Sequence, residues 1–232
     1  MTERRSTKRR PRIVGVIASR DDLERALRMR RPPDLFELRL DRLPTAVIDR
    51  LENMLPKLGA PLIITARHPQ EGGAGKLSTR ERRALLTRFL ARAHYIDVEL
   101  RSAQAMRSLL ALAGKKKVCR IISFHSVKST PSARLLSAKA RQAKAHRADI
   151  FKVATRTDNP GELGRLLDFI TSSRVNLPVA VMGVGQLGAI SRVLLARAGS
   201  VLTYASLGAA SDIEGQLSLE QLAHLGIGTI FK

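Results

Sequence analysis

Short apolar runs alternate along this chain with longer stretches in which apolar residues recur every three or four positions. The short runs are rich in Val, Ile and Leu, which is typical of buried strands, and the longer stretches have the period of amphipathic helices. The pattern predicts eight strands, at 12–18, 35–40, 61–67, 94–100, 117–124, 149–155, 177–183 and 201–207.

Helical patterns lie between these runs, and several carry start and stop signals such as Ser78 before a helix and Gly114 after one. Strand–helix alternation indicates parallel strands joined by right-handed crossovers. Eight such units in 232 residues predict a (β/α)8 TIM barrel of a single domain, because that fold usually takes about 250 residues. The predicted helices cover 21–30, 46–59, 78–93, 103–114, 132–146, 161–173 and 189–199.

A doubly wound open sheet is the alternative fold. It normally carries a glycine-rich phosphate loop after its first strand, and the sequence VGVIASRDD at 14–22 has none. The sequence GVGQLG at 183–188 has the G-x-G-x-x-G spacing but follows the seventh predicted strand, so we interpret it as a mobile or anion-contacting loop. The expected organisation is a basic N-terminal tail at 1–11 followed by the barrel at 12–232.

The net charge of +21 is unusual. A surface of this charge attracts nucleic acid and anionic membranes. Aromatic residues make up only 3% of the chain, however, so there are few platforms on which bases could stack. Many of the cations are arginines along predicted helices, as in RERRALLTRFLARAH at 80–94. We therefore favour a basic solvated surface over nucleic-acid binding.

The remaining composition narrows the compartment and the cofactors. No apolar run approaches the roughly 20 residues of a membrane helix, and no apolar segment follows the basic N-terminus as in a secretory signal. The single cysteine, Cys119, excludes an internal disulfide and a cysteine-rich metal site. We expect a cytoplasmic protein that does not bind membranes.

Charged side chains occur on five consecutive predicted strands, the second to the sixth. Residues two apart share a face of a strand, so Glu37 lies on the same face as Arg39, and Asp97 on the same face as Glu99. One such strand alone is well explained by partial exposure. Five in succession favour a polar site inside the barrel, where charges pair or bind a ligand. The candidates are Glu37, Arg39, Asp41, Arg67, Glu71, Asp97, Glu99, His125 and Lys152.

Lys152 lies within the apolar run DIFKVAT, in which we expect Ile150 to point inward and Phe151 and Val153 to pack against helices. A free lysine has a pKa of about 10.4 and is a poor nucleophile, but burial and nearby cations such as Arg39 or Arg67 would lower that pKa. A neutral amine can then form a Schiff base with a ketone or aldehyde.

A protonated Schiff base acidifies the neighbouring carbon, so a base must lie close to it. Histidine has a suitable pKa for taking and returning a proton. His125 ends the strand before that of Lys152, so the two side chains can meet at one end of the barrel.

The segments FELRLD, ITARHPQEGG, YIDVEL, IISFHS, FKVAT, VMGVGQLGAISR, GSVLTYASL and EGQ occur in this order across nearly the whole chain. Together they resemble the type I 3-dehydroquinate dehydratases, enzymes of the shikimate pathway of aromatic biosynthesis. The resemblance implies a (β/α)8 fold, no metal, no organic cofactor and a homodimer. It also implies a hydro-lyase reaction, the conversion of 3-dehydroquinate to 3-dehydroshikimate.

The resemblance also implies roles for individual residues. Lys152 forms the imine, His125 moves the proton and protonates the departing hydroxyl, and Glu71 orients His125. Arg192 grips the substrate carboxylate, and a closing loop contributes Gln216. Asp97 and Glu99 match partners of the site rather than catalysts. The remaining matches around the substrate are Glu37, Arg39, Arg67 and Ser211.

This chain departs from the family pattern in two places. The closing loop reads SDIEGQ at 211–216, where the family more often has the shorter Ser-Ala-Pro-Gly-Gln, and Val16 stands where many relatives have a serine. Two alternatives remain: another Schiff-base barrel lyase of the aldolase type, or a basic nucleic-acid-binding protein on a barrel scaffold. Such aldolases also carry a lysine on the sixth strand, so Lys152 does not distinguish them. The set of Glu37, Arg39, Arg67, Glu71, His125 and Arg192 favours the dehydratase.

Overall fold

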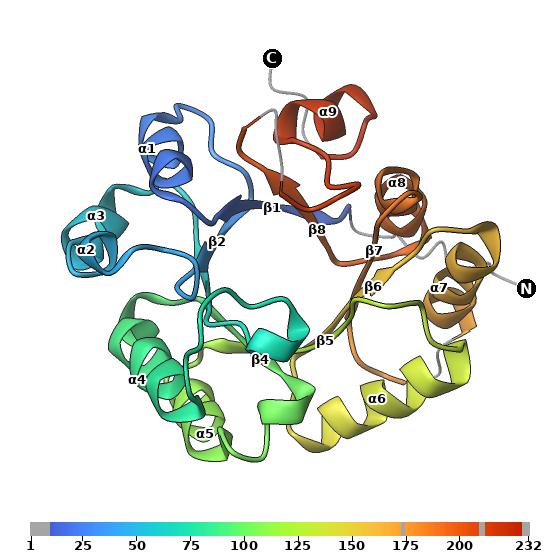
Figure 1. The fold of residues 1–232 in the computed structure, drawn as a ribbon, viewed down its shortest axis with the longest axis horizontal. Coiled ribbons are helices and arrows are strands. Elements are labelled where there is room, and N and C mark those ends of the chain that lie inside the picture. Colours follow the sequence, from blue (N-terminus) through green and yellow to red (C-terminus); the bar gives the residue numbers. More distant parts are fainter. Residues whose placement is uncertain (1–9, 173–174, 209–211, 229–232) are drawn as a thin grey trace, which may run out of the picture.

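Eight parallel strands form a nearly closed barrel, and helices surround it (Figure 1). The computed structural model describes residues 10–172, 175–208 and 212–228. Neighbouring strands pair in the order β7-β6-β5-β4-β3-β2-β1-β8, so the predicted barrel is confirmed and the open-sheet alternative is wrong. The strands are β1 Arg12–Ile17, β2 Leu35–Arg39, β3 Leu62–Thr65, β4 Tyr95–Glu99, β5 Cys119–Ser126, β6 Ile150–Arg156, β7 Val179–Val184 and β8 Leu202–Ser206.

The barrel is nearly closed between β7 and β8, the two ends of the strand order. There the Val201 amide donates to the Val179 carbonyl over 2.9 Å. The Ser200 hydroxyl accepts from the Val181 amide, also over 2.9 Å. These bonds satisfy backbone groups that an open edge would leave exposed to solvent.

Each long helix follows a strand and packs on the outside of the barrel (Figure 1). Ser78 begins α4 with a capping box, exchanging hydrogen bonds with Glu81, and Ser132 caps α6 through its side chain. These helices are α1 Arg20–Arg28, α4 Thr79–Phe89, α5 Arg107–Lys115, α6 Ala133–Ala145, α7 Pro160–Ser172 and α8 Gly188–Ala198.

Two helical regions differ from the sequence prediction. The helix predicted at 46–59 is instead two single turns, α2 Thr45–Ile48 and α3 Leu51–Met54, followed by the 3-10 turn η1 Leu55–Lys57. Pro56 lies in that turn and lacks the amide hydrogen that a continuing α-helix needs. The helix α9 Leu219–His224 was not predicted, because six residues are too few to show a helical period. The other 3-10 turns are η2 Pro69–Glu71, η3 Leu90–Arg92 and η4 Leu100–Ser102.

Apolar side chains form two layers, one inside the barrel and one between the barrel and its helices. Ile150 belongs to the inner layer, while Phe151 and Val153 belong to the outer layer, as predicted. The Phe151 ring meets Phe169 of α7 edge to face at 6.3 Å. Lys152, between these outward residues, must therefore point into the barrel. No helix in the described parts of the chain is both long and apolar enough to cross a membrane.

Candidate active site

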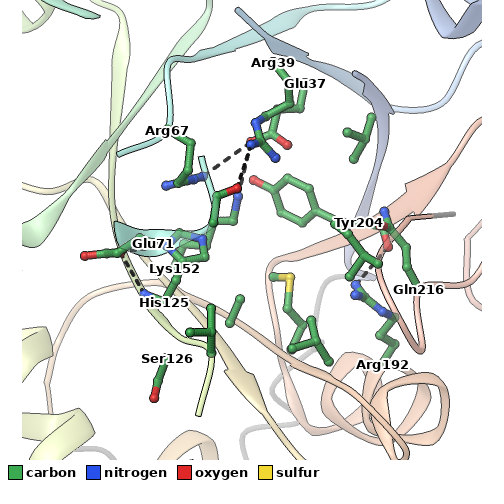
Figure 2. A pocket seen from close by; sticks show the side chains of 17 residues that line it. Glu37, Arg39, Arg67, Glu71, His125, Ser126, Lys152, Arg192, Tyr204 and Gln216 are labelled. Atoms are coloured by element: carbon green, nitrogen blue, oxygen red, sulfur yellow. Dashed lines mark hydrogen bonds and ion pairs between the residues drawn. The ribbon is translucent and has the colours of Figure 1, made fainter. Parts of the chain in front are cut away.

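A cavity of about 200 Å³ opens where the strands of the barrel end (Figure 2). The residues predicted to act on or bind the substrate all line it where they are described, whereas Ser211 lies outside the described residues. The candidates Asp41, Asp97 and Glu99 do not line the cavity and instead pair with arginines that do. Glu71 and His125 lie on one side of the cavity, and Arg192 and Gln216 lie on the opposite side (Figure 2). Glu37, Arg39, Arg67 and Lys152 complete the predicted set.

Lys152 is buried within β6, where it pairs in register with Ser123 of β5. Its Nζ donates to Asp97 Oδ2 over 3.0 Å and to Glu37 Oε1 over 3.3 Å. From the sequence we expected cations such as Arg39 or Arg67 beside this amine. Its direct hydrogen-bond partners are carboxylates instead. The strand period directs Glu37 and Asp97 into the barrel, and both carboxylates there lie within hydrogen-bond distance of the amine.

Arg67 connects the acidic side chains of the barrel. Its guanidinium donates to both carboxylate oxygens of Asp97 over 3.1 and 2.9 Å, to Glu99 over 3.3 Å and to Ser123 Oγ over 2.7 Å. Burial would lower the pKa of Arg67, but the charges of Asp97 and Glu99 raise it above its ordinary value. Burial likewise raises the pKa of Asp97, but Arg67 and Lys152 outweigh it and hold that pKa below its usual range.

Arg82 is a member of this network that the sequence prediction missed, because it was counted among the surface arginines of 80–94. It is fully buried, donates to the Ala66 carbonyl over 2.7 Å and pairs with Glu99. The available signal was its position four residues before Leu86 and seven before Phe89, which places it on the apolar face of α4.

The network therefore joins three cationic side chains to three carboxylates inside one barrel. Removing one member of a buried pair leaves its partner without a counter-charge, which costs about 3–5 kcal/mol. Substitutions that keep the charge are accordingly the safer probes of chemistry here. The six residues are Glu37, Arg67, Arg82, Asp97, Glu99 and Lys152.

His125 and Glu71 form a hydrogen-bonded pair at the mouth of the cavity. The Glu71 Oε2 atom lies 2.9 Å from His125 Nδ1 and accepts the His125 amide over 3.0 Å. Burial, followed by the positive charges of Arg67 and Lys152, lowers the pKa of His125 well below its ordinary value. The imidazole is therefore neutral at pH 7. A hydrogen on Nδ1 is donated to Glu71, which leaves the Nε2 lone pair as the basic site.

The height of His125 above Lys152 follows from the strand register. Ser123 pairs with Lys152, and His125 pairs with Ala154, two residues nearer the mouth. His125 therefore leaves its strand nearer the mouth than Lys152 does, and both side chains line the same cavity (Figure 2).

The pKa of Glu71 is raised to about 7, chiefly by burial and secondly by the charge of Glu99. We expect kcat/KM to fall as the pH drops through about 7, because a protonated Glu71 no longer accepts the Nδ1 hydrogen.

The Glu71→Gln variant keeps an oxygen acceptor but cannot titrate. The fall of its kcat/KM on the acid side should therefore move to the lower pKa of His125. Its kcat should fall about tenfold, as expected when one charge-assisted hydrogen bond becomes a neutral one.

Rate profiles of both enzymes between pH 5 and 9 test this expectation, with circular dichroism at each pH as the control for folding. An acid limb at the same pH in both enzymes would assign the titration to a group other than Glu71.

Arg192 differs from the other cations in the cavity. It is 3% exposed and donates only to backbone oxygens among the described residues, namely Gly215 over 3.1 Å and Tyr204 over 3.1 Å. Burial lowers the pKa of Arg192 to about 10, and no carboxylate among the described residues pairs with it. A buried cation of this kind is stabilised by an anion, so Arg192 provides a site for an anionic group of a ligand.

Arg39 is held at the rim by Asp41. Its Nε and Nη2 atoms donate to the two Asp41 oxygens over 2.9 and 2.8 Å. Asp41 also accepts the Ala74 amide over 3.0 Å, which links the end of β2 to the loop that contains Glu71. Asp41 lies two residues beyond the end of β2, so the bidentate pair with Arg39 sets its position.

The glycines of GVGQLG serve close packing between loops. A Cβ on Gly215 would lie 2.5 Å from the Gly185 carbonyl oxygen and 2.7 Å from Gly188 Cα. The Gly185 amide donates to the Glu214 carbonyl over 3.0 Å, and Gly185 has a positive φ of 93°. These contacts hold the described part of the closing loop, including Gln216, against the start of α8.

Tyr204 also lines the cavity and was missed by the sequence prediction. Its ring centroid lies 3.9 Å from Lys152 Nζ, and its buried hydroxyl has no hydrogen-bond partner within the described residues. The ring therefore covers one side of the amine by a cation–π contact. The signal was its place in VLTYASL, two residues before Ser206 on the inner face of β8.

The fold and the site together define a (β/α)8 barrel with a buried lysine amine in the cavity at the ends of its strands. The family model of type I 3-dehydroquinase matches residues 14–225. The chain belongs to this family.

Individual relatives agree over nearly their whole length. A 3-dehydroquinate dehydratase from Thermodesulfovibrio yellowstonii is 30% identical over 217 residues, which cover 93% of this chain and 94% of the relative. The crystal structure of 3-dehydroquinate dehydratase from Geobacillus kaustophilus HTA426 superposes with a TM-score of 0.82 at 27% identity, covering 93% of this chain and 89% of that one. The 3-dehydroquinate dehydratase structure from Enterococcus faecalis gives a TM-score of 0.76 at 29% identity, with coverages of 86% and 90%.

Proposed function

We propose that this protein removes water from 3-dehydroquinate to give 3-dehydroshikimate, and that it does so through an imine on Lys152. The observation that carries the proposal is the arrangement of the cavity. One cavity of about 200 Å³ is lined by a buried amine, a histidine–glutamate pair and a buried arginine without a carboxylate partner in the described chain. A ketone that also bears a carboxylate fits these three features.

In the proposed reaction, Lys152 Nζ attacks the substrate ketone as a neutral amine, after giving a proton to its surroundings. The Glu37 carboxylate lies 3.3 Å from Nζ and is proposed to accept that proton. The adduct then loses the former carbonyl oxygen as water and becomes an iminium ion. Asp97 and Glu37 next to the nitrogen stabilise its positive charge.

His125 Nε2 then takes a proton from the carbon next to the iminium carbon, and the electron pair of that bond enters the conjugated system. The hydroxyl on the following carbon departs with the proton held by His125. Water finally hydrolyses the imine and restores the Lys152 amine. Imine formation releases one water and hydrolysis consumes one, so the net change is the loss of one water from the substrate.

Arg192 is proposed to bind the substrate carboxylate. We expect Arg192→Gln to lower kcat/KM by about 10²- to 10³-fold, mainly through a higher KM, because two charge-assisted hydrogen bonds are lost. Arg197→Gln is the matched control, since Arg197 is exposed on the same helix and donates to the Gly226 carbonyl. A higher KM in the Arg197 variant, or an unchanged KM in the Arg192 variant, would contradict this assignment.

The activity itself is tested by incubating the protein with 3-dehydroquinate and following the ultraviolet absorbance of the conjugated product. The same preparation is offered sugar phosphates, whose carbon–carbon cleavage would instead support an aldolase-type Schiff-base lyase. We expect water loss from 3-dehydroquinate only. Cleavage of a sugar phosphate without dehydration would overturn the proposal.

Three further features concern the domain organisation, the compartment and the oligomeric state. We propose that residues 12–232 form the catalytic barrel, that residues 1–11 lie outside it, and that the enzyme works in the cytoplasm. We also propose a homodimer, which Ile190 and Leu194 support because both are exposed and lie one turn apart on α8. Sedimentation velocity of the wild-type protein and of Ile190→Ser tests this, and a wild-type monomer would contradict it.

A further inference from the structure

The end of the barrel opposite the active site is strongly basic. It consists of the connections that run from each helix to the next strand, and these carry many more cations than carboxylates. The two acidic side chains there, Asp34 and Asp149, each already pair with an arginine, Arg10 and Arg120 respectively. Several cations in these connections, or in the last helical turn before them, have no carboxylate partner among the described residues. They include Arg30, Arg31, Lys57, Arg92, Lys115, Lys116, Lys117, Lys144 and Arg147.

A hollow of about 460 Å³ lies between α5 and α6 and reaches this end of the barrel at Arg120 and Arg147. Arg107, Arg120, His146 and Arg147 line it. The Arg120 guanidinium also lies over Gly114, with Nη1 only 3.2 Å from where a Cβ on that glycine would be. Arg120, which lines the hollow, thus also lies beside the last turn of α5, and Lys115, Lys116 and Lys117 follow Gly114 directly.

Helix stability explains only part of this charge. A cation in the last turn of a helix interacts favourably with the helix dipole, and the effect fades within that turn. Lys117 and Arg147 follow the ends of α5 and α6 in the left-handed region, with φ of 58° and 62°. Glycine and asparagine adopt that conformation more readily. Both side chains are exposed, and neither forms an ion pair within the described chain.

We propose that this end of the barrel, around the hollow between α5 and α6, binds the phosphate backbone of double-stranded nucleic acid without reading its sequence. Clustered guanidinium and ammonium groups suit phosphate oxygens, and each contact releases condensed counterions. The hollow is lined by no Phe, Tyr or Trp, so bases of a single strand would find no platform for stacking. This inference is independent of the dehydratase activity.

The location predicts that binding and catalysis coexist. The catalytic cavity opens at the ends of the strands, whereas the hollow lies outside the barrel between α5 and α6 and shares no lining residue with the cavity. A duplex bound at the hollow leaves the cavity open to substrate. Competition between a duplex and 3-dehydroquinate would instead mean that the duplex occupies the cationic active site.

The test measures the fluorescence anisotropy of labelled DNA and RNA duplexes of about 20 base pairs against the full-length protein over a range of salt concentrations. The probe variant is Lys117→Asn with Arg147→Asn, because asparagine suits the left-handed backbone at both positions. The matched control is Arg80→Gln with Arg134→Gln, which removes the same charge from exposed first turns of α4 and α6 at the other end of the barrel.

We expect the probe variant to bind both duplexes at least about tenfold more weakly near 0.1 M salt, with a slope of log K against log salt that is flatter by about 2. The control should bind like the wild type, and turnover of the wild type should be unchanged by either duplex. Equal weakening in both variants, loss of turnover on adding duplex, or binding to phosphatidylserine vesicles but to neither duplex would overturn the proposal. Binding of only one duplex type would keep the site and identify its ligand as DNA or RNA.

Discussion

Lys152→Arg is expected to lower kcat for 3-dehydroquinate dehydration by at least about 10⁴-fold while the protein stays folded. The guanidinium keeps a positive charge between Asp97 and Glu37, which lie 3.0 and 3.3 Å from the native amine. It remains protonated at any working pH and cannot form the imine. Initial rates from the absorbance of the conjugated product, with a melting curve for each protein, measure both expectations.

Lys139→Arg is the matched control for this experiment. Lys139 is partly buried in α6, and its Nζ lies 4.2 Å from the ring centroid of Phe124, so it also makes a cation–π contact but outside the cavity. Its variant should turn over at the wild-type rate. Turnover by Lys152→Arg within tenfold of the wild type would contradict the covalent role of Lys152.

His125→Ala is expected to lower kcat by about 10³- to 10⁴-fold and still to form the imine with substrate. General acid–base catalysis by one positioned group contributes about 10² to 10⁴ in rate, and here one group serves proton removal and hydroxyl departure. Lys152 and its carboxylate partners do not depend on the imidazole for their contacts. The imine should therefore accumulate rather than turn over.

Intact-protein mass spectrometry after borohydride reduction measures that accumulation, and kcat is measured in parallel. His224→Ala serves as the control, because His224 is exposed at the end of α9, outside the cavity. Wild-type turnover in His125→Ala, or failure of that variant to trap substrate at all, would show that the assigned role of His125 is wrong.

The architecture was predictable because each strand is a short apolar run and each long helix shows its own period. All eight predicted strands overlap the observed ones, and the extension of β5 to Ser126 adds His125 to the strand itself. The inward direction of Lys152 followed from strand alternation alone. The break at 46–59 was less accessible, since Pro56 acts through a missing backbone donor rather than through the hydrophobic pattern.

The charged partners of Lys152 could not be predicted from the sequence. Which charges touch depends on how the strands are arranged around the barrel. Glu37 and Asp97 contact the amine, while Arg67 pairs with Asp97 and Glu99. Arg82 was overlooked for a related reason. An arginine in a basic helix is usually solvated, and its burial here depends on Glu99 and the Ala66 carbonyl, which lie on other elements.

The proposed mechanism depends on an imine between the substrate and the Lys152 amine. Chemical trapping of this imine tests the mechanism most directly. The wild-type protein is incubated with 3-dehydroquinate and borohydride, digested, and examined by peptide mass spectrometry. A reduced adduct on the peptide that contains Lys152, absent from the Lys152→Arg protein, is the predicted result. An active enzyme with no adduct, or with its adduct on another lysine, would contradict the account.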